Sequence, residues 1–310
     1  RDELVARLLS NETWNGYYDQ PKPSCLIIMN TVQSAAIIAE TLARKLDDKD
    51  TELSCKEVLH LSTALAPKDR NKMLKEVIRR QTESDWDKKQ WYLVATSCVE
   101  AGVDLDFAVG YRESCSVTSF LQVSGRINRH GKRICGKLYD FSIVADDGLN
   151  HHPGLEESSD ILRELWPDLI SGNKGNNILC SIAIRKELSR FLDKENKSKQ
   201  LLDYEQKQGF QDVSRDFRII DSETATVIVK RNIVDKLELG VPVPWQTIQE
   251  NSVQLWTNKI KKLQLREIRG CKQDGIYSWV DSYDYDQNFL GIMSGVLQQR
   301  IFFQESGGVF

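Results

Sequence analysis

Short apolar runs alternate with segments of helical period throughout residues 25–145, and this alternation constrains the fold more than any other feature of the chain. CLIIMN and WYLVA are two of these runs, and each is followed at once by polar residues. We expect strands at 25–30, 57–61, 91–95 and 107–111, and a last strand formed by 137–141 and 143–144. Strands that alternate with helices predict an α/β fold, a parallel sheet with helices on both faces.

The segments between these strands have the pattern of amphipathic helices. The first places a run of apolar residues on one face, which we expect to be buried: Ala35, Ile38, Ala39, Leu42 and Leu46. Polar groups follow the strands at 30–31, 62–63 and 96–100. Because ligands bind beyond the carboxyl ends of parallel strands, we expect these groups to gather along one edge of the sheet.

Residues 116–131, SVTSFLQVSGRINRHG, are predicted to form one helix that Ser116 caps and Gly131 ends in the left-handed conformation. Its two faces differ: Phe120, Val123 and Ile127 lie on one, and Gln122, Arg126 and Arg129 on the other. A solvated basic stripe explains the second face equally well as a phosphate site. The two arginines have no acidic partner nearby in the sequence, which favours a phosphate supplied from outside and an arginine finger.

The segment TSCVEAGVD, residues 96–104, follows the third strand. Gly102 permits a tight backbone path, and Thr96 and Ser97 offer hydroxyls and amides that suit a nucleic-acid backbone. Asp104 offers an acceptor for a ribose hydroxyl. The alternative is an ordinary loop with a glycine turn.

No complete nucleotide site is expected in this chain. Residues 131–138, GKRICGKL, match a phosphate loop, but Leu138 stands where Ser or Thr must bind Mg²⁺, and the segment follows a helix and enters a strand. Asp2 and Glu3 resemble an acidic box without the hydrophobic strand that precedes one. We interpret both as chance.

Composition excludes several classes of protein. The net charge of −3 argues against a wholly basic nucleic-acid binder but leaves room for a local basic groove. The seven cysteines are scattered, without a zinc-type spacing, as in reduced cytoplasmic proteins. No apolar run approaches the length of a membrane span, and we expect no signal peptide. The chain begins with Arg1, so we expect a fragment of something longer or a separate subunit.

After residue 146 the pattern changes to a smaller accessory α+β domain. We expect helices at 160–169 and 178–202, a loop at 171–177, a β-hairpin from 217–220 and 225–230, and mixed structure at 245–265. The predicted divisions are a lead-in at 1–23, the main domain at 24–147, a linker with helices at 148–202, and a C-terminal domain at 203–310.

T-x-x-x-E-x-G-x-D at 96–104 and Q-x-x-G-R-x-x-R at 122–129, after an apolar strand that ends in Asn-Thr, resemble motifs IV, V and VI of superfamily 2 helicases. Within that superfamily the chain resembles the CRISPR-associated helicase of type I systems, a helicase-nuclease that degrades invading DNA. The segments that carry this second resemblance are LSTALAPKDR (61–70), RINRHG (126–131), FRIIDSETATVIV (217–229) and YDYDQNFLGI (283–292).

The resemblance implies the second RecA-like domain plus the C-terminal domain of such a helicase. Arg126 and Arg129 match motif VI positions that reach the γ-phosphate and are the expected catalytic residues. Nucleotide contacts are implied for Gly102, Asp104 and Gln122, and DNA-backbone contacts for Asn30, Thr31, Thr63, Thr96, Ser97 and Glu100. Many relatives have Arg where Val123 stands, so the chain departs from the pattern there.

The sequence therefore favours half of an ATP-dependent single-stranded-DNA translocase in a prokaryotic cytoplasm, inactive alone. By resemblance, its partners are an N-terminal half with an HD nuclease, single-stranded DNA and a CRISPR surveillance complex. ATP and Mg²⁺ are bound mainly by that N-terminal half, and no metal site is expected here. Another superfamily 2 helicase half, acting on DNA or RNA, and a non-catalytic RecA-like binding module remain alternatives.

Overall fold

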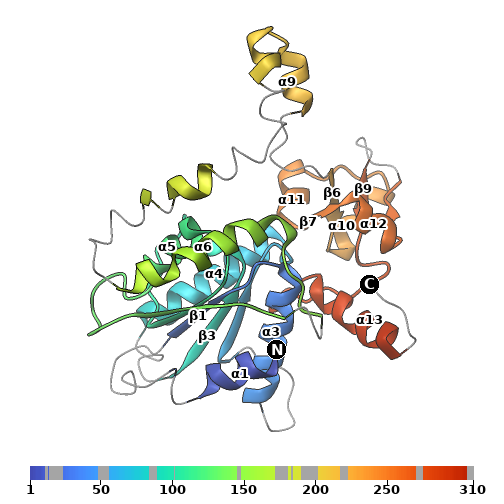
Figure 1. Cartoon of the computed structure of the whole chain (residues 1–310). Coiled ribbons are helices and arrows are strands. Elements are labelled where there is room, and N and C mark those ends of the chain that lie inside the picture. Colours follow the sequence, from blue (N-terminus) through green and yellow to red (C-terminus); the bar gives the residue numbers. More distant parts are fainter. Residues whose placement is uncertain are drawn as a thin grey trace. The chain divides into compact units, whose positions relative to one another are not determined.

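The computed structural model of the chain describes residues 1–10, 13, 24–47, 56–83, 89–100, 102–144, 148–171, 181–182, 184–189, 202–216, 223–269 and 275–305. The chain forms two compact units (Figure 1). The first comprises residues 1–113, 121–152 and 224–310, and the second comprises 114–120 and 153–223. The domain boundaries expected from the sequence remain a prediction.

A five-stranded parallel sheet forms the centre of the first unit, as the alternating pattern predicted. Its strands are β1 (Ser24–Ile28), β2 (Val58–Leu61), β3 (Trp91–Ala95), β4 (Val109–Glu113) and β5 (Lys137–Phe141). They lie in the order β2-β3-β1-β4-β5, and every neighbouring pair is parallel. β4 begins two residues later than expected, and 143–144 lie outside β5.

Successive residues of the central strand β1 point to opposite faces, and each face is covered by helices. Cys25 and Ile27 lie in a buried cluster with side chains of α1 (Asp2–Leu9) and α3 (Val32–Leu46). Leu26 and Ile28 lie in a second cluster with α4 (Pro67–Thr82). This arrangement confirms a sheet with helices on both faces.

The helices between the strands agree with their patterns except at one position. On α3 the predicted apolar face is buried, but Leu46 in the last turn is 37 % exposed. Leu46 precedes the C-cap Asp47, where the helix ends, so it extends past the sheet it was expected to cover. On α4, Pro67 occupies the first turn, where its missing N–H removes no helical hydrogen bond.

The helix predicted at 116–131 is wrong at its C-terminal end. α5 spans Val117–Ser124, and the Ser116 hydroxyl accepts from the Ser119 N–H at 3.0 Å, as its cap role predicts. Beyond Ser124 the chain pairs with Phe107 instead of continuing the helix: the Phe107 N–H donates to the Arg126 carbonyl, and the Asn128 N–H donates to the Phe107 carbonyl. Gly131 has the expected positive φ of 61°, but no helix ends there.

The second unit contains a 3₁₀ turn, Pro153–Leu155, followed by α6 (Glu156–Ser171) and by α9 (Phe210–Asp216). α6 confirms the predicted helix at 160–169 and extends it. Of the helix predicted at 178–202, the described residues 181–182 and 184–189 are helical. Residue 202 is also helical, and the rest of that segment lies outside the described residues. The loop predicted at 171–177 is wrong at Ser171, which is the last residue of α6, and 172–177 lie outside the described residues.

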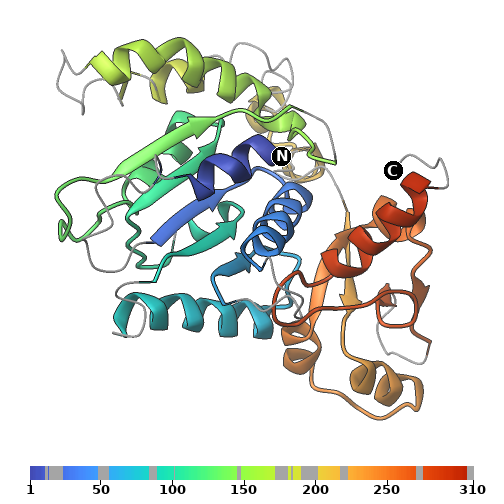
Figure 2. The same ribbon diagram turned by 90° about the horizontal axis from the view of Figure 1, so that it is seen from below.

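The C-terminal part of the first unit contains a mixed sheet in the order β7-β6-β9-β8 (Figure 2). Its strands are β6 (Thr224–Ile228), β7 (Ser252–Trp256), β8 (Arg266–Glu267) and β9 (Ile276–Ser278). Its helices are α10 (Arg231–Glu238), α11 (Trp245–Glu250), α12 (Thr257–Lys262) and α13 (Met293–Glu305). The α+β class is as predicted. Of the expected hairpin, 217–220 lie outside the described residues, and β6 pairs with β7 and β9.

The two sheets share a core, and a buried histidine lies where they meet. Val227 and Trp279 of the C-terminal part belong to the same apolar cluster as Ile38 of α3. His60 of β2 is fully buried, and its Nδ1 donates to the Phe289 carbonyl at 2.9 Å. Burial lowers the pKa of His60 from its ordinary value to about 4, because the charged imidazolium would lose its hydration.

Protonation of His60 is therefore expected to weaken the fold. Between the unfolded pKa of 6.5 and the folded value of about 4, the unfolded chain binds the proton and the folded chain does not, so stability falls as the pH falls. Between about pH 7 and about pH 5, this histidine should remove about 2 kcal/mol of unfolding free energy. In urea titrations, His60→Asn keeps a donor near the Nδ1 position and should flatten the curve by that amount. An unchanged pH profile would contradict the assignment.

Candidate nucleotide and nucleic-acid site

The carboxyl ends of β1, β3 and β4 bring together segments that are far apart in the sequence. Residues 30–31 follow β1, residues 96–106 follow β3, and residues 112–113 end β4. The turn at 126–133 joins them through the pairing of Phe107 with Ile127. The edge of the sheet is thus where the sequence predicted that polar groups gather.

The loop after β3 begins with the 3₁₀ turn Ser97–Val99 and bends at Gly102, whose φ of 79° bears out the expected tight path. Thr96 is buried, and its hydroxyl lies 3.6 Å from the Cys98 sulfur. Ser97 is exposed. Of the two hydroxyls predicted to face a nucleic-acid backbone, the structure leaves that of Ser97 open to solvent.

A buried ionic network ties three of the strands together through Arg112, a residue that the sequence analysis missed. Its side chain is 2 % exposed, with Nε 3.2 Å from the Glu100 carboxylate. Its Nη1 donates to the Asn30 side-chain oxygen at 2.6 Å, and the Asn30 N–H donates to the Glu113 carboxylate at 2.8 Å. Burial raises the pKa of Glu113, against the lowering effect of the Asn30 amide and the Arg112 charge. Asn30 and Glu100 are thus engaged inside the protein.

Arg126 is held in a largely buried position at the start of the turn at 126–133. It is 8 % exposed, and Nη2 donates to the Glu100 carbonyl at 3.0 Å. Among the described residues no carboxylate forms an ion pair with Arg126, and its Nε is buried without a hydrogen-bond partner.

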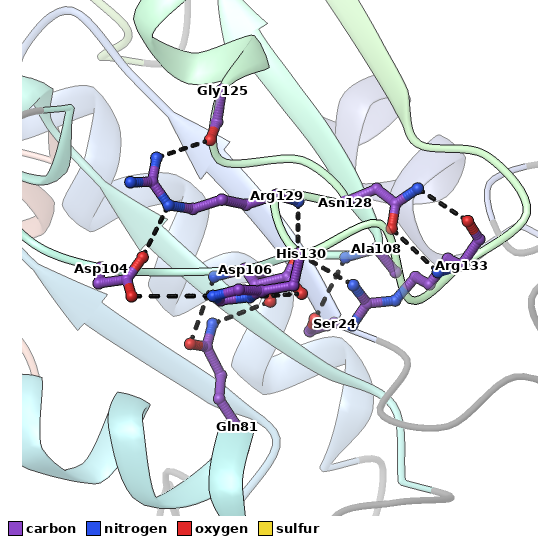
Figure 3. A network of polar contacts seen from close by, with 10 residues as sticks. All are labelled: Ser24, Gln81, Asp104, Asp106, Ala108, Gly125, Asn128, Arg129, His130 and Arg133. Atoms are coloured by element: carbon purple, nitrogen blue, oxygen red, sulfur yellow. Dashed lines mark hydrogen bonds and ion pairs between the residues drawn. The ribbon is translucent and has the colours of Figure 1, made fainter.

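Arg129 differs, and here the expectation was wrong. Its Nε lies 2.7 Å from the Asp104 carboxylate, with the two side chains 43 % and 68 % exposed (Figure 3). Nη1 also donates to the Gly125 carbonyl at 3.2 Å. The acid is 25 positions away in the sequence, so a search for local partners overlooked it. The Phe107–Ile127 bridge brings the two segments side by side.

A second cluster around Asp106 fixes the same turn, and the sequence analysis missed it. The Asp106 carboxylate accepts from the Arg129 N–H at 2.8 Å and from Arg133 Nη1 at 3.1 Å (Figure 3). Its other oxygen lies 3.2 Å from His130 Nδ1, and its carbonyl accepts from the Gln81 amide at 3.1 Å. An acid two residues after Asp104, in a run rich in acids, was a usable signal. The Asp106 cluster thus fixes the backbone of the turn that carries Arg129.

The other residues predicted for the site are not part of the Arg112 and Asp106 networks. Thr31 caps α3, where its hydroxyl accepts from the Ser34 N–H at 3.1 Å. Gln122 on α5 and Thr63 after β2 are exposed.

Within the described ranges, no group of three or more His, Cys, Asp or Glu residues could hold a metal ion. None of the described helices has the length and apolar character to cross a membrane.

Comparison with known families agrees with this geometry. Residues 22–132 match the family model of the C-terminal region of the CRISPR-associated nuclease/helicase Cas3. Over these residues the chain is similar to the C-terminal region of Cas3. The match runs from β1 to Lys132 and includes Arg112, Arg126 and Arg129. The resemblance inferred from the motifs is confirmed.

Solved structures agree at the level of the fold. T. fusca Cas3 with ADP aligns with a TM-score of 0.57 at 11 % identity, over 88 % of this chain and 37 % of that one. A CRISPR-associated protein aligns at 0.54 and 15 %, over 89 % and 37 %. A CRISPR RNA-guided surveillance complex captured before nicking aligns at 0.54 and 11 %, over 93 % and 41 %. The chain thus spans about two fifths of these Cas3-type chains. The search of curated proteins found no match.

Removal of Arg112 should be costly because it leaves the Glu100 carboxylate buried and unpaired. We expect Arg112→Met to lower the unfolding free energy by about 3 kcal/mol or more. Arg79, an exposed arginine paired with Glu76 and Glu83, provides the matched control, and Arg79→Met should cost less than about 1 kcal/mol.

Urea unfolding of both variants measures the difference. The double variant Arg112→Met, Glu100→Met should recover part of the loss, since it removes the buried charge with its partner. Equal shifts for Arg112→Met and Arg79→Met would show that the network does not support the site.

Proposed function

We propose that this chain is the C-terminal half of an ATP-dependent single-stranded-DNA translocase of CRISPR interference in the prokaryotic cytoplasm. Its partners are an N-terminal half, which supplies the phosphate loop, the Mg²⁺ site and the HD nuclease, and a CRISPR surveillance complex. The observation that carries the proposal is the presentation of Arg126 and Arg129 beside Gly102 and Asp104, inside the region that matches Cas3.

The two arginines suit different parts of one task. Arg126 is buried without an acid, so an incoming phosphate would meet an unneutralised guanidinium. Arg129 is paired with Asp104, but both side chains are substantially exposed, and an exposed pair contributes only about 0–1 kcal/mol. A nucleotide triphosphate with Mg²⁺ can therefore compete for Arg129. We propose that Asp104 holds this finger until ATP arrives across the domain interface.

Nucleic-acid contact is proposed for the exposed hydroxyls of Thr63 and Ser97 and for the backbone groups around Thr31 and Thr96. Contacts of this kind bind sugar and phosphate and carry no base specificity, as translocation along any sequence requires. Asn30 and Glu100 serve the site through Arg112, by fixing the strand ends that carry these loops. Gln122 extends from α5 toward solvent and is proposed as a nucleotide contact.

Loss of the finger should separate catalysis from binding. In the complete enzyme, we expect Arg129→Ala to lower the ATP turnover number by about 10³-fold or more, while the dissociation constant for single-stranded DNA stays within about twofold. Lys132→Ala changes an exposed cation three residues later and should leave turnover unchanged. Equal losses of turnover and DNA affinity in Arg129→Ala would point to a DNA-binding or structural role.

The chain alone should not hydrolyse ATP at a measurable rate, because it lacks a phosphate loop. Phosphate release should appear when the N-terminal half is added and should increase with single-stranded DNA. Robust DNA-stimulated hydrolysis by the isolated chain would refute the division of the site between two halves. Stronger stimulation by RNA than by DNA would favour the other superfamily 2 translocases. Persistent inactivity of the combined halves would favour a non-catalytic binding module.

A further inference from the structure

The loop between β2 and α4 presents a single side chain to solvent. Leu61, Ser62, Ala64, Leu65 and Ala66 are all at most 5 % exposed. Thr63 alone in this stretch is exposed, and its hydroxyl makes no hydrogen bond within the described residues. The loop leaves the carboxyl end of a parallel strand, where ligands of such sheets bind. A buried loop that exposes one hydroxyl at this edge must be held in that shape by contacts from elsewhere in the chain.

These contacts come from the segment 285–292, more than 200 residues later in the chain. The Ile292 N–H donates to the Ala64 carbonyl at 3.1 Å. The Tyr285 hydroxyl accepts from the Ala66 N–H at 2.9 Å and donates to the Asp69 carboxylate at 2.9 Å. The Asp69 side chain is fully buried and is neutralised by Lys72 at 3.2 Å and by Lys230 at 3.6 Å. The backbone that directly follows Thr63 is therefore hydrogen-bonded to the C-terminal part at two points.

The segment that holds the loop is itself rigid. The Asp286 carboxylate accepts the N–H groups of Asn288, Phe289 and Leu290 at 2.9–3.2 Å. Asp286 and Gly291 exchange two backbone hydrogen bonds, which close the turn. Gly291 has a φ of 62°, and a Cβ there would collide with the Ala64 carbonyl. Only glycine permits this approach of the two backbones.

We propose that Tyr285 and Gly291 are positioning residues, which hold the β2–α4 loop so that the Thr63 hydroxyl contacts the sugar–phosphate backbone of single-stranded DNA. This inference rests on the proposed function. It assigns the C-terminal part a direct role in strand binding through the RecA-like sheet. One neutral hydrogen bond that is misplaced or lost changes affinity by about fivefold.

A double-mutant cycle tests the link between the two residues. In the chain combined with its N-terminal half, a fluorescent oligothymidine reports the dissociation constant. We expect Thr63→Ala to raise it about fivefold and Tyr285→Phe about two- to fivefold. The double variant should equal Thr63→Ala, because the position of a missing hydroxyl has no effect. Multiplied effects in the double variant, or no effect of Thr63→Ala, would overturn the proposal.

Tyr283→Phe is the matched control. Tyr283 donates its hydroxyl to the Leu263 carbonyl at 2.8 Å, within the C-terminal part and away from the loop. This variant loses the same kind of hydrogen bond and should bind oligothymidine as the wild type does. Tyr285→Phe should raise the DNA concentration that half-activates ATP hydrolysis and leave turnover at saturating DNA unchanged. A fall in saturated turnover would indicate a general structural role and overturn the proposal.

Hydrogen exchange of the chain provides a readout that needs neither DNA nor ATP. Tyr285→Phe removes the acceptor of the Ala66 N–H, so the amides of the β2–α4 loop should exchange faster, whereas Tyr283→Phe should leave them unchanged. Gly291→Ala should have a larger effect through the collision with Ala64. Unchanged exchange in both loop variants would overturn the proposal. If the wild-type halves bind DNA but never hydrolyse ATP, the translocase function fails, while the cycle still measures positioning.

Discussion

The buried guanidinium of Arg112 is the interaction on which the edge of the sheet depends. It lies at the end of β4, beside the central strand β1, and it bonds to Asn30, two residues after β1, and to Glu100 in the loop after β3. A buried ion pair rarely adds much net stability, because desolvation offsets the attraction between the charges. What it does supply is geometry, since a buried charge tolerates few alternative positions. The contacts of Arg112 therefore set the distances between the polar loops of the site.

Much of the fold follows from local pattern, and the exceptions have physical causes. β3 was predicted to the residue because its apolar run ends at polar neighbours, whereas β5 begins where expected but ends before 143–144. The prediction placed β4 two residues too early, because charged residues such as Arg112 and Glu113 usually lie in loops. Both are buried, and their charges are satisfied by Asn30 and Glu100, from the loops that follow β1 and β3. Partners distant in sequence leave no local signal, so a single sequence could not place the end of this strand.

The candidate site shows the same limit. The spacing of Gln122, Arg126 and Arg129 suits one continuous helix, and only the partner strand segment at Phe107 ends it early. The motif order allowed the arginines, Gly102 and Asp104 to be predicted as one site. Their division into buried and exposed members was not predictable, because it depends on contacts across about 25 positions. DNA contacts were implied for Asn30, Thr31 and Glu100 by the resemblance to helicase motifs, yet their side chains bond to other groups of the protein.

The site contains two arginine–carboxylate pairs, one buried and one exposed, and they differ in how easily the two charges can be separated. The Arg112–Glu100 pair is almost fully buried, so separating it would strand a charge in a poorly polarisable interior. The Arg129–Asp104 pair lies in solvent, where water replaces either partner at little cost. The proposed function needs both: a scaffold that does not move during the cycle, and a cation that can change partners when phosphate arrives and leaves. Under that proposal, two arginine–carboxylate pairs serve as framework and as switch, and their depth below the surface decides which role each has.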